Sequence, residues 1–128
     1  MDERTIEILK RFDASWKKTG AWYDELINQH EGFERLIPIR KFMVDLELTG
    51  GKKLYRLGTS MHTLMISRSV DHGLRKDQKY VSIEAISSDC FEVKMREGSK
   101  IYREYRVKTL KDVRVSKLLQ TLKCVLVD

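Results

Sequence analysis

The amino-acid sequence predicts an α+β fold: two N-terminal helices, a curved antiparallel sheet of about six strands in meander order, and one C-terminal helix. Three observations predict it. Apolar residues recur at helical spacing over residues 3–29, alternate with polar residues over much of residues 42–108, and return to helical spacing beyond residue 109. Strands that are adjacent in the sequence and joined by short turns favour antiparallel pairing. The helices must then cover the apolar face of the sheet.

The N-terminal region predicts two helices, residues 3–18 and 21–29. Thr19-Gly20 interrupts the apolar pattern between them. Pro38 disfavours a helical conformation at Ile37, so we place the boundary between the helices and the sheet there.

The middle of the chain predicts six strands because apolar and polar residues alternate between turn-forming segments. In the fifth strand, Phe91, Val93 and Met95 are expected to face the core. The polar residues 71–78 are expected to form a turn region. The predicted strands are residues 42–48, 54–60, 64–70, 80–87, 90–96 and 101–108.

The C-terminal region predicts one helix. Residues 109–112 have the spacing of a capping box, and Leu118, Leu119 and Leu122 supply an apolar face. The apolar residues 124–127 are expected to pack on the core.

Composition and length fit one globular domain, 1–128. The chain has 128 residues, of which 41% are hydrophobic and 34% charged, and these fractions exclude a wholly disordered chain. An acidic start without an apolar leader and the lack of a long apolar run predict a cytoplasmic protein with no membrane partner. Cys90 and Cys124 are expected to be buried free thiols rather than one disulfide.

The net charge of +6 is unevenly distributed. Residues 1–40 carry a net charge of −1, whereas residues 41–128 carry +7. This bias favours an anionic partner, and nucleic acid or an acidic protein is the expected class. A solvated surface without a partner is the alternative.

Motifs for catalysis, metals and cofactors are lacking. His30, His62 and His72 have no metal-ligand spacing, and no cofactor motif occurs. The glycines of residues 50–53 are expected to form a hairpin turn rather than a phosphate-binding loop. We therefore assign no metal or cofactor.

Two further patterns could suggest catalysis. Ser60 lies two residues from His62, but this spacing does not make a nucleophile–base pair. Asp45 and Glu47 would share one face of a strand, where cross-strand ion pairs explain them better than hydrolysis. No catalytic residue is assigned, and the preferred function is a non-catalytic binding domain.

Three arginines fall on predicted apolar strand faces. Arg56, Arg68 and Arg103 could converge on a pocket and hold a small anion, with His62 and Tyr105 as polar neighbours, and Tyr55 another. Such a pocket protein or enzyme is the alternative function.

A structural role for these arginines is also open. Strand bulges or edge positions could place them in solvent. Asp13 and Glu84 are candidate internal partners for Arg68, and Asp13 is the preferred one because it interrupts an apolar helix face.

A basic and aromatic surface is predicted on the other face of the last two strands. Nucleic-acid-binding proteins use cations for phosphates and aromatic rings for stacking. Glu92 and Glu104 interrupt the surface, so a solvated face is the alternative. The residues of this predicted basic surface are Lys94, Arg96, Tyr102 and Arg106.

Overall fold

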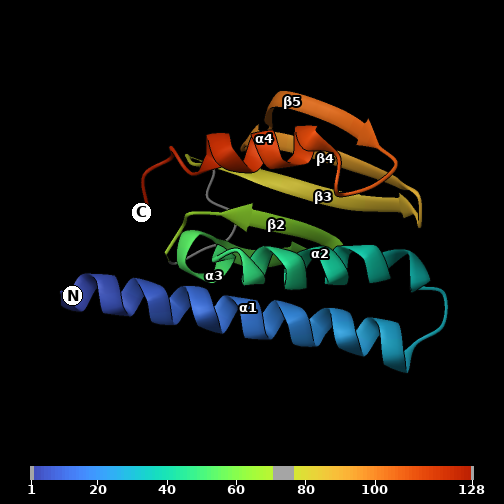
Figure 1. The fold of residues 1–128 in the computed structure, drawn as a ribbon, viewed down its shortest axis with the longest axis horizontal. Coiled ribbons are helices and arrows are strands. Elements are labelled where there is room, and N and C mark those ends of the chain that lie inside the picture. The colour runs from blue at the N-terminus through green and yellow to red at the C-terminus, as the bar shows by residue number, and fades with distance from the viewer. Residues whose placement is uncertain (1, 71–76, 128) are drawn as a thin grey trace.

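A computed structural model describes residues 2–70 and 77–127 of the chain. It confirms an α+β fold in which N-terminal helices precede an antiparallel sheet and a C-terminal helix follows it (Figure 1). Residues 71–76, which include His72 and most of the predicted turn region, lie outside the described residues. In chain order the elements are α1 (Glu3–Gln29), the short 3-10 helix η1 (Glu34–Leu36), α2 (Ile37–Leu48), α3 (Gly51–Leu54), β1 (Arg56–Ser60), β2 (Thr63–Ser67), β3 (Lys79–Ser87), β4 (Cys90–Glu97), β5 (Lys100–Val107) and α4 (Val113–Leu122).

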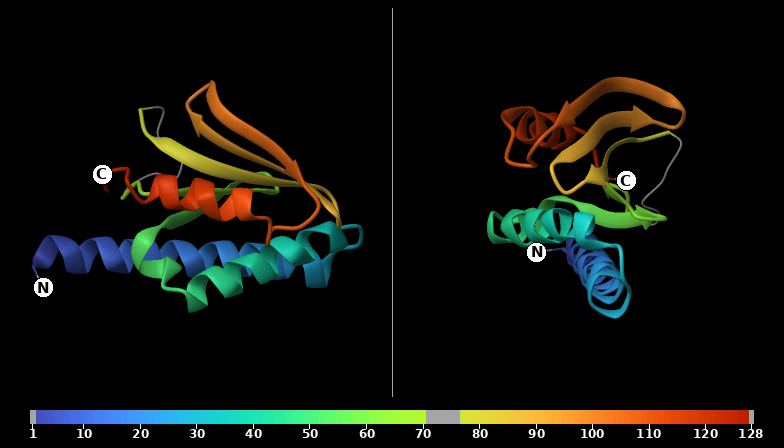
Figure 2. Two further views of the ribbon diagram at one scale, coloured as in Figure 1. Left: turned by 45° about the horizontal axis from the view of Figure 1, so that its top comes forward. Right: turned by 90° about the vertical axis from the view of Figure 1, so that its right-hand side faces the viewer.

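Within the described residues the sheet has five antiparallel strands in the order β1-β2-β3-β4-β5. The strands predicted at residues 54–60 and 64–70 correspond to β1 and β2, which are shorter than predicted. Figure 2 shows the sheet curving, with α1 and α2 near β1 and β2, and α4 under the later strands. The register shifts between Ala85 and Ser87 and again between Met95 and Arg96, and such bulges bend a strand.

One face of the sheet forms the core together with α1, α2 and α4. In β4 the core residues are Phe91, Val93 and Met95, as the alternation predicts. The opposite face, which we call the outer face, carries the intervening residues such as Met65 and Lys94. The core also takes these helical side chains: Tyr23, Leu26, Ile39, Met43, Leu118, Leu119 and Leu122.

The two predicted N-terminal helices are one continuous helix, α1. Gly20 lies within it, although glycine costs about 1 kcal/mol relative to alanine in a helix. Its role is close packing, because a Cβ atom there would lie 3.1 Å from Nη2 of Arg40 in α2. Arg40 donates hydrogen bonds of 2.9 and 3.2 Å to the two carboxylate oxygens of Asp24 on α1.

The predicted strand at residues 42–48 is wrong: this segment is part of helix α2. Ile37 is helical, with φ −55° and ψ −46°, and Pro38 occupies the first turn, where its missing N–H costs nothing. Ile39 and Met43 are buried one turn apart, whereas the alternating residue Leu48 is 81% exposed.

The predicted hairpin turn at residues 50–53 is also wrong. Gly50 adopts φ +90°, which favours glycine, and Gly51 then begins the short helix α3. A Cβ atom on Gly51 would lie 2.8 Å from the carbonyl oxygen of Leu46, so α2 and α3 can approach this closely because the residue is glycine.

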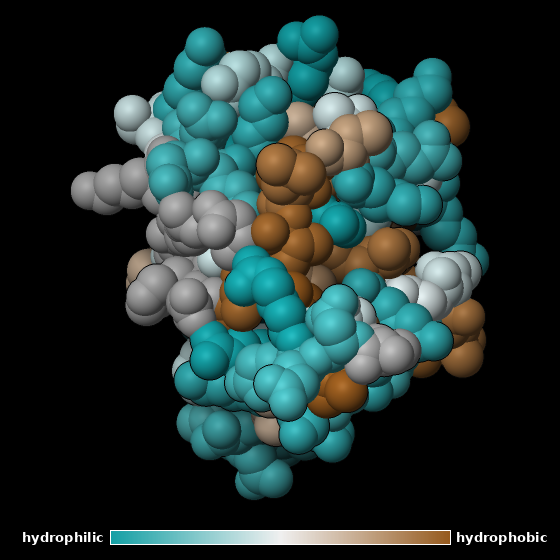
Figure 3. Space-filling view, turned by 90° about the vertical axis from the view of Figure 1, so that its left-hand side faces the viewer, coloured by the Kyte–Doolittle hydropathy of each residue, from teal (hydrophilic) through white to brown (hydrophobic). Residues whose placement is uncertain are grey.

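The C-terminal helix is confirmed, but it begins at Val113. Asp112 is its N-cap and accepts a hydrogen bond of 2.9 Å from the Arg114 N–H. Val125 packs against the core as expected, whereas Leu126 is 83% exposed. Figure 3 views the end of the molecule that carries both termini and shows a band of apolar side chains between hydrophilic surfaces.

Candidate functional site

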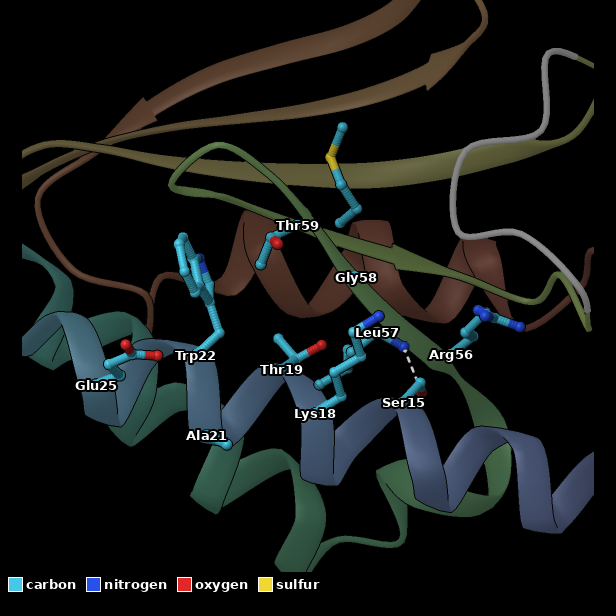
Figure 4. A pocket seen from close by; sticks show the side chains of 11 residues that line it. Ser15, Lys18, Thr19, Ala21, Trp22, Glu25, Arg56, Leu57, Gly58 and Thr59 are labelled. Atoms are coloured by element: carbon cyan, nitrogen blue, oxygen red, sulfur yellow. Dashed lines mark hydrogen bonds between the residues drawn. The ribbon is translucent and has the colours of Figure 1, made fainter.

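A groove lined by described residues lies between α1 and the edge strand β1. Its volume is about 710 Å³, within the range of small-molecule sites. Figure 4 shows α1 side chains along one wall and β1 along the other. Met65 of β2 also lines the groove. The lining residues are Ser15, Lys18, Thr19, Ala21, Trp22, Glu25, Arg56, Leu57, Gly58, Thr59 and Met65.

The spacing of residues on α1 explains the helical wall of the groove. Ser15, Lys18, Trp22 and Glu25 recur at intervals of three and four residues, so they share one side of the helix. The neighbouring stripe, which includes Phe12, Trp16 and Tyr23, is buried in the core. One side of α1 therefore packs in the core, and the adjacent side lines the groove.

Hydrogen bonds hold β1 against α1. The Ser15 hydroxyl accepts the Leu57 N–H at 3.0 Å, and the Trp16 indole N–H donates to the Tyr55 carbonyl at 2.9 Å. The Trp22 indole N–H donates to the Met61 carbonyl at 3.2 Å in the turn between β1 and β2. Helix α1 thus satisfies backbone groups along an edge strand, which fixes the groove walls and shields the edge from pairing.

The groove has a positively charged end and an aromatic end. In Figure 4, Ser15 and Arg56 lie towards one end, Trp22 and Glu25 lie towards the other, and Lys18 lies between them. Trp22 is 38% exposed, an unusual exposure for so large an apolar ring. Within the described residues, Lys18 and Glu25 form no salt bridge, and neither histidine nor cysteine lines the groove.

Only one of the three predicted arginines lines this groove. Arg56 does so, and its guanidinium also donates to the Val70 carbonyl. Arg68 is half-buried and donates to the Leu54 carbonyl at 3.0 Å, while its Nε is buried with no hydrogen-bond partner in the structure. Arg103 is exposed and donates to the Tyr102 carbonyl. The three arginines therefore do not converge on one pocket.

The predicted ion pair between Asp13 and Arg68 is wrong. Asp13 instead lies 3.0 Å from the Lys17 ammonium and 3.3 Å from that of Lys52. Hydrogen bonds from Lys17 and then Lys52 lower the pKa of the Asp13 carboxyl. Glu84, the second candidate partner, is exposed on β3.

The predicted polar neighbours of the arginines also lie elsewhere. The His62 ring packs edge-on against Phe33, with ring centroids 4.9 Å apart, and its main-chain carbonyl accepts the Tyr23 hydroxyl. The Arg114 guanidinium lies over the Tyr105 ring. Tyr55 is buried and donates to the Leu119 carbonyl at 2.9 Å, and burial raises the pKa of its hydroxyl to about 12.

The predicted basic surface is largely neutralised by its own acidic neighbours. Glu92 accepts from Arg106 at 2.9 Å and lies 3.2 Å from the Lys94 ammonium, and Glu104 lies 3.8 Å from the same ammonium. Hydrogen bonds from Arg106 and then Lys94 lower the pKa of Glu92. These carboxylates complete an ionic network on the outer face.

The remaining residues of the predicted basic surface are Arg96 and Tyr102. Arg96 lines a small polar hollow of about 130 Å³, and its Nε is buried with no hydrogen-bond partner in the structure. Tyr102 packs against the core, with the ammonium groups of Lys79 and Lys100 4.8 and 4.6 Å from its ring centroid. The ring is therefore already occupied by cations.

Other predicted features also differ in the structure. Glu47 lies on helix α2 and forms a salt bridge of 2.7 Å with Lys52, so Asp45 and Glu47 do not share a strand face. Cys90 and Cys124 are free thiols, but neither is buried as predicted: Cys90 is half-buried and Cys124 is exposed. Among the described residues no cluster of three metal-ligating side chains occurs.

Sequence reasoning missed most residues of the groove. Trp22 lies beside the buried stripe of α1 that includes Leu26, on the side of the helix that faces the groove. The sequence does contain a pattern that predicts the groove wall. If residues 3–29 are taken as one helix, Ser15, Thr19 and Trp22 recur at helical spacing beside the buried stripe.

Comparison with known proteins finds no matching family, no similar curated protein and no matching solved structure. None of the helices in the described part of the chain is long and apolar enough to cross a membrane. The function must therefore be inferred from the geometry and chemistry of the groove.

Proposed function

We propose that the protein is a non-catalytic binding domain whose groove between α1 and β1 holds a small amphipathic anion, such as a fatty acid or an aromatic carboxylate. One observation carries this proposal: a single groove of about 710 Å³ combines the apolar side chains of Trp22, Leu57 and Met65 with the cations Lys18 and Arg56. Ligand sites typically combine an apolar lining with a few polar groups that fix orientation.

The arrangement of charges favours one orientation of the ligand. The acidic group lies near Lys18 and the Ser15 end of the groove, because Glu25 at the far end would repel it. The apolar part then lies against Trp22 and Met65. This orientation requires no new partner for Arg56, which already donates to Val70.

The titratable groups of the groove support binding rather than catalysis. Lys18, Glu25 and Arg56 line it, and within the described residues neither Lys18 nor Glu25 forms a hydrogen bond with a serine or cysteine, as a base that activates a nucleophile would. The Ser15 hydroxyl donates to the Phe12 carbonyl at 2.6 Å and accepts from Leu57, so it is a structural group. The free thiols of Cys90 and Cys124 support a reducing, cytoplasmic location.

Titration with anilinonaphthalene sulfonate, followed by displacement with laurate, tests the proposal. Both are amphipathic anions, and the dye fluoresces on entering an apolar site. We expect saturable one-to-one binding, displacement by laurate, and at least about fivefold weaker binding of both by Lys18→Glu, which turns an attraction into a repulsion. Lys10→Glu is the matched control, because Lys10 is exposed on α1 outside the groove.

A second pair of variants tests the location by shape. Ala21→Phe fills the groove from its helical wall and should abolish dye binding, whereas Ala14→Phe, on an exposed part of α1 outside the groove, should leave it unchanged. Far-ultraviolet circular dichroism checks that each variant is folded. Dye binding that survives both Ala21→Phe and Lys18→Glu would contradict the proposal.

A further inference from the structure

A second groove lies between helix α2 and the segment that joins β5 to α4. Its volume is about 370 Å³. Phe42, Phe91 and Leu110 are among its apolar lining residues, and Ile37 lines it with 49% of its surface exposed. Its apolar lining is continuous with the core, because Phe91 and Leu110 belong to the core cluster. We call it the α2–α4 groove.

Three lysines line the α2–α4 groove. Lys41 comes from α2, and Lys108 and Lys111 come from the joining segment; all three are exposed. Within residues 2–70 and 77–127 none of them forms a salt bridge, and Asp45 is the one carboxylate among the described lining residues. The groove therefore carries a positive charge that the described part of the chain does not neutralise.

This charge differs from that of the outer face, where Lys94 and Arg106 have glutamate partners. It also differs from that of Arg114 on α4, which pairs with Asp112 at 3.0 Å. Among the described lining residues, the lysines of the α2–α4 groove surround apolar side chains and one carboxylate, that of Asp45. This combination fits a partner that brings both apolar and negatively charged groups.

The segment that carries Lys108 and Lys111 is held in place by local hydrogen bonds. The Thr109 hydroxyl accepts the Lys111 N–H at 3.2 Å, and the Thr109 carbonyl accepts the Asp112 N–H at 3.2 Å. Leu110 is buried between the two lysines. The positions of the lysine backbones are thus fixed before binding, which lowers the entropic cost of association.

We infer that the α2–α4 groove docks an acidic segment of a partner protein. An apolar side chain of the segment packs on Phe42 and Leu110, and flanking carboxylates face Lys41, Lys108 and Lys111. A protein partner fits better than nucleic acid because the groove is apolar and small. Single-stranded nucleic acid needs open aromatic faces for stacking, and cations already cover the rings of Tyr102 and Tyr105.

Fluorescence anisotropy with a designed peptide tests this inference. The probe is a fluorescein-labelled peptide in which a phenylalanine–leucine pair is flanked by three glutamates on each side. We expect micromolar binding that weakens as ionic strength rises from about 0.05 M to about 0.5 M. The double variant Lys108→Glu/Lys111→Glu should weaken binding at least about tenfold, because two attractions become repulsions.

Matched controls separate the groove from general charge. Lys117→Glu/Lys123→Glu makes the same change in net charge at exposed lysines that do not line the groove, and it should retain binding. A peptide with serine–glycine in place of phenylalanine–leucine should bind at least about fivefold more weakly, because it has no apolar anchor.

Three results would overturn the inference. One is the absence of peptide binding to the folded protein. Another is an equal loss of affinity in the two double variants, which would indicate unspecific attraction. The third is tighter binding of a labelled oligothymidylate, lost in Lys108→Glu/Lys111→Glu, which would assign the groove to nucleic acid. Far-ultraviolet circular dichroism checks that each double variant is folded.

Discussion

Ser15 joins helix α1 to the edge strand β1, and replacing it by alanine tests how the groove between them is built. Ser15 as a residue is 8% exposed. Its hydroxyl accepts a hydrogen bond from the Leu57 N–H at 3.0 Å and donates one to the Phe12 carbonyl at 2.6 Å. In Ser15→Ala the Leu57 N–H loses its acceptor, and Leu57 is only 2% exposed. The Phe12 carbonyl is less affected, because it belongs to the helix.

The expected magnitude follows from two opposing effects. A buried donor left without an acceptor costs about 1–3 kcal/mol. Alanine favours the helix by about 0.5 kcal/mol relative to serine. The free energy of unfolding should therefore fall by about 0.5–2.5 kcal/mol in Ser15→Ala.

Urea denaturation measures this change, and Ser116→Ala is the matched control. The Ser116 hydroxyl is exposed on α4 and donates only to the carbonyl of Val113 in the same helix, so its removal should change stability by less than about 0.5 kcal/mol. Amide hydrogen exchange at Leu57 should accelerate in Ser15→Ala alone. Equal stability of the two variants, with unchanged exchange at Leu57, would refute the role assigned to Ser15.

Two further predictions concern the joint between the helices and the sheet. Gly51→Ala should lower the free energy of unfolding by about 1–3 kcal/mol in urea denaturation. The reason is that the alanine Cβ would lie 2.8 Å from the Leu46 carbonyl oxygen and 3.0 Å from the Trp16 ring. A variant as stable as the wild type would contradict this packing. Tyr55→Phe should cost about 1 kcal/mol at neutral pH by removing the hydrogen bond to Leu119. Burial raises the pKa of Tyr55 from 10.0 to about 12, so its contribution is complete below pH 10 and is lost as the pH rises towards 12. The melting temperature of Tyr55→Phe should fall less steeply than that of the wild type over this interval, and parallel curves would contradict the assignment.

The order of the sheet strands could be predicted because most of them are bounded by clear turns. The strands near residues 80–87, 90–96 and 101–108 appear as β3, β4 and β5. In β4 the alternation also identified the core face correctly, because this strand is central and has one apolar face.

Helix α2 could not be identified from alternation alone. Phe42, Val44, Leu46 and Leu48 satisfy period two, yet Val44 and Leu48 are exposed. The helical pattern is carried by Ile39 and Met43, which are four residues apart and buried. A period of two does not predict that both of them are buried together. Short apolar segments fit both periods, and tertiary packing decides between them.

The three arginines do not come together because the alternation of a strand does not show where its face is covered. Arg103 pairs in register with Met95, so it shares a face with Tyr105 and Val107, yet it is exposed because β5 is an edge strand of the sheet. Whether an edge position is covered depends on the whole fold. The groove of α1 was missed because Gly20 suggests a break that packing against Arg40 overrides.

Protection of Trp22 from acrylamide tests the central claim most directly. Trp22 lines the groove with 38% exposure, whereas Trp16 is 4% exposed in the core, so quenching by this neutral molecule reports mainly on Trp22. If laurate occupies the groove, saturating laurate should reduce the quenching constant of the wild type towards that of Trp22→Phe and leave that variant unchanged. Wild-type quenching that laurate does not alter would contradict a ligand site between α1 and β1.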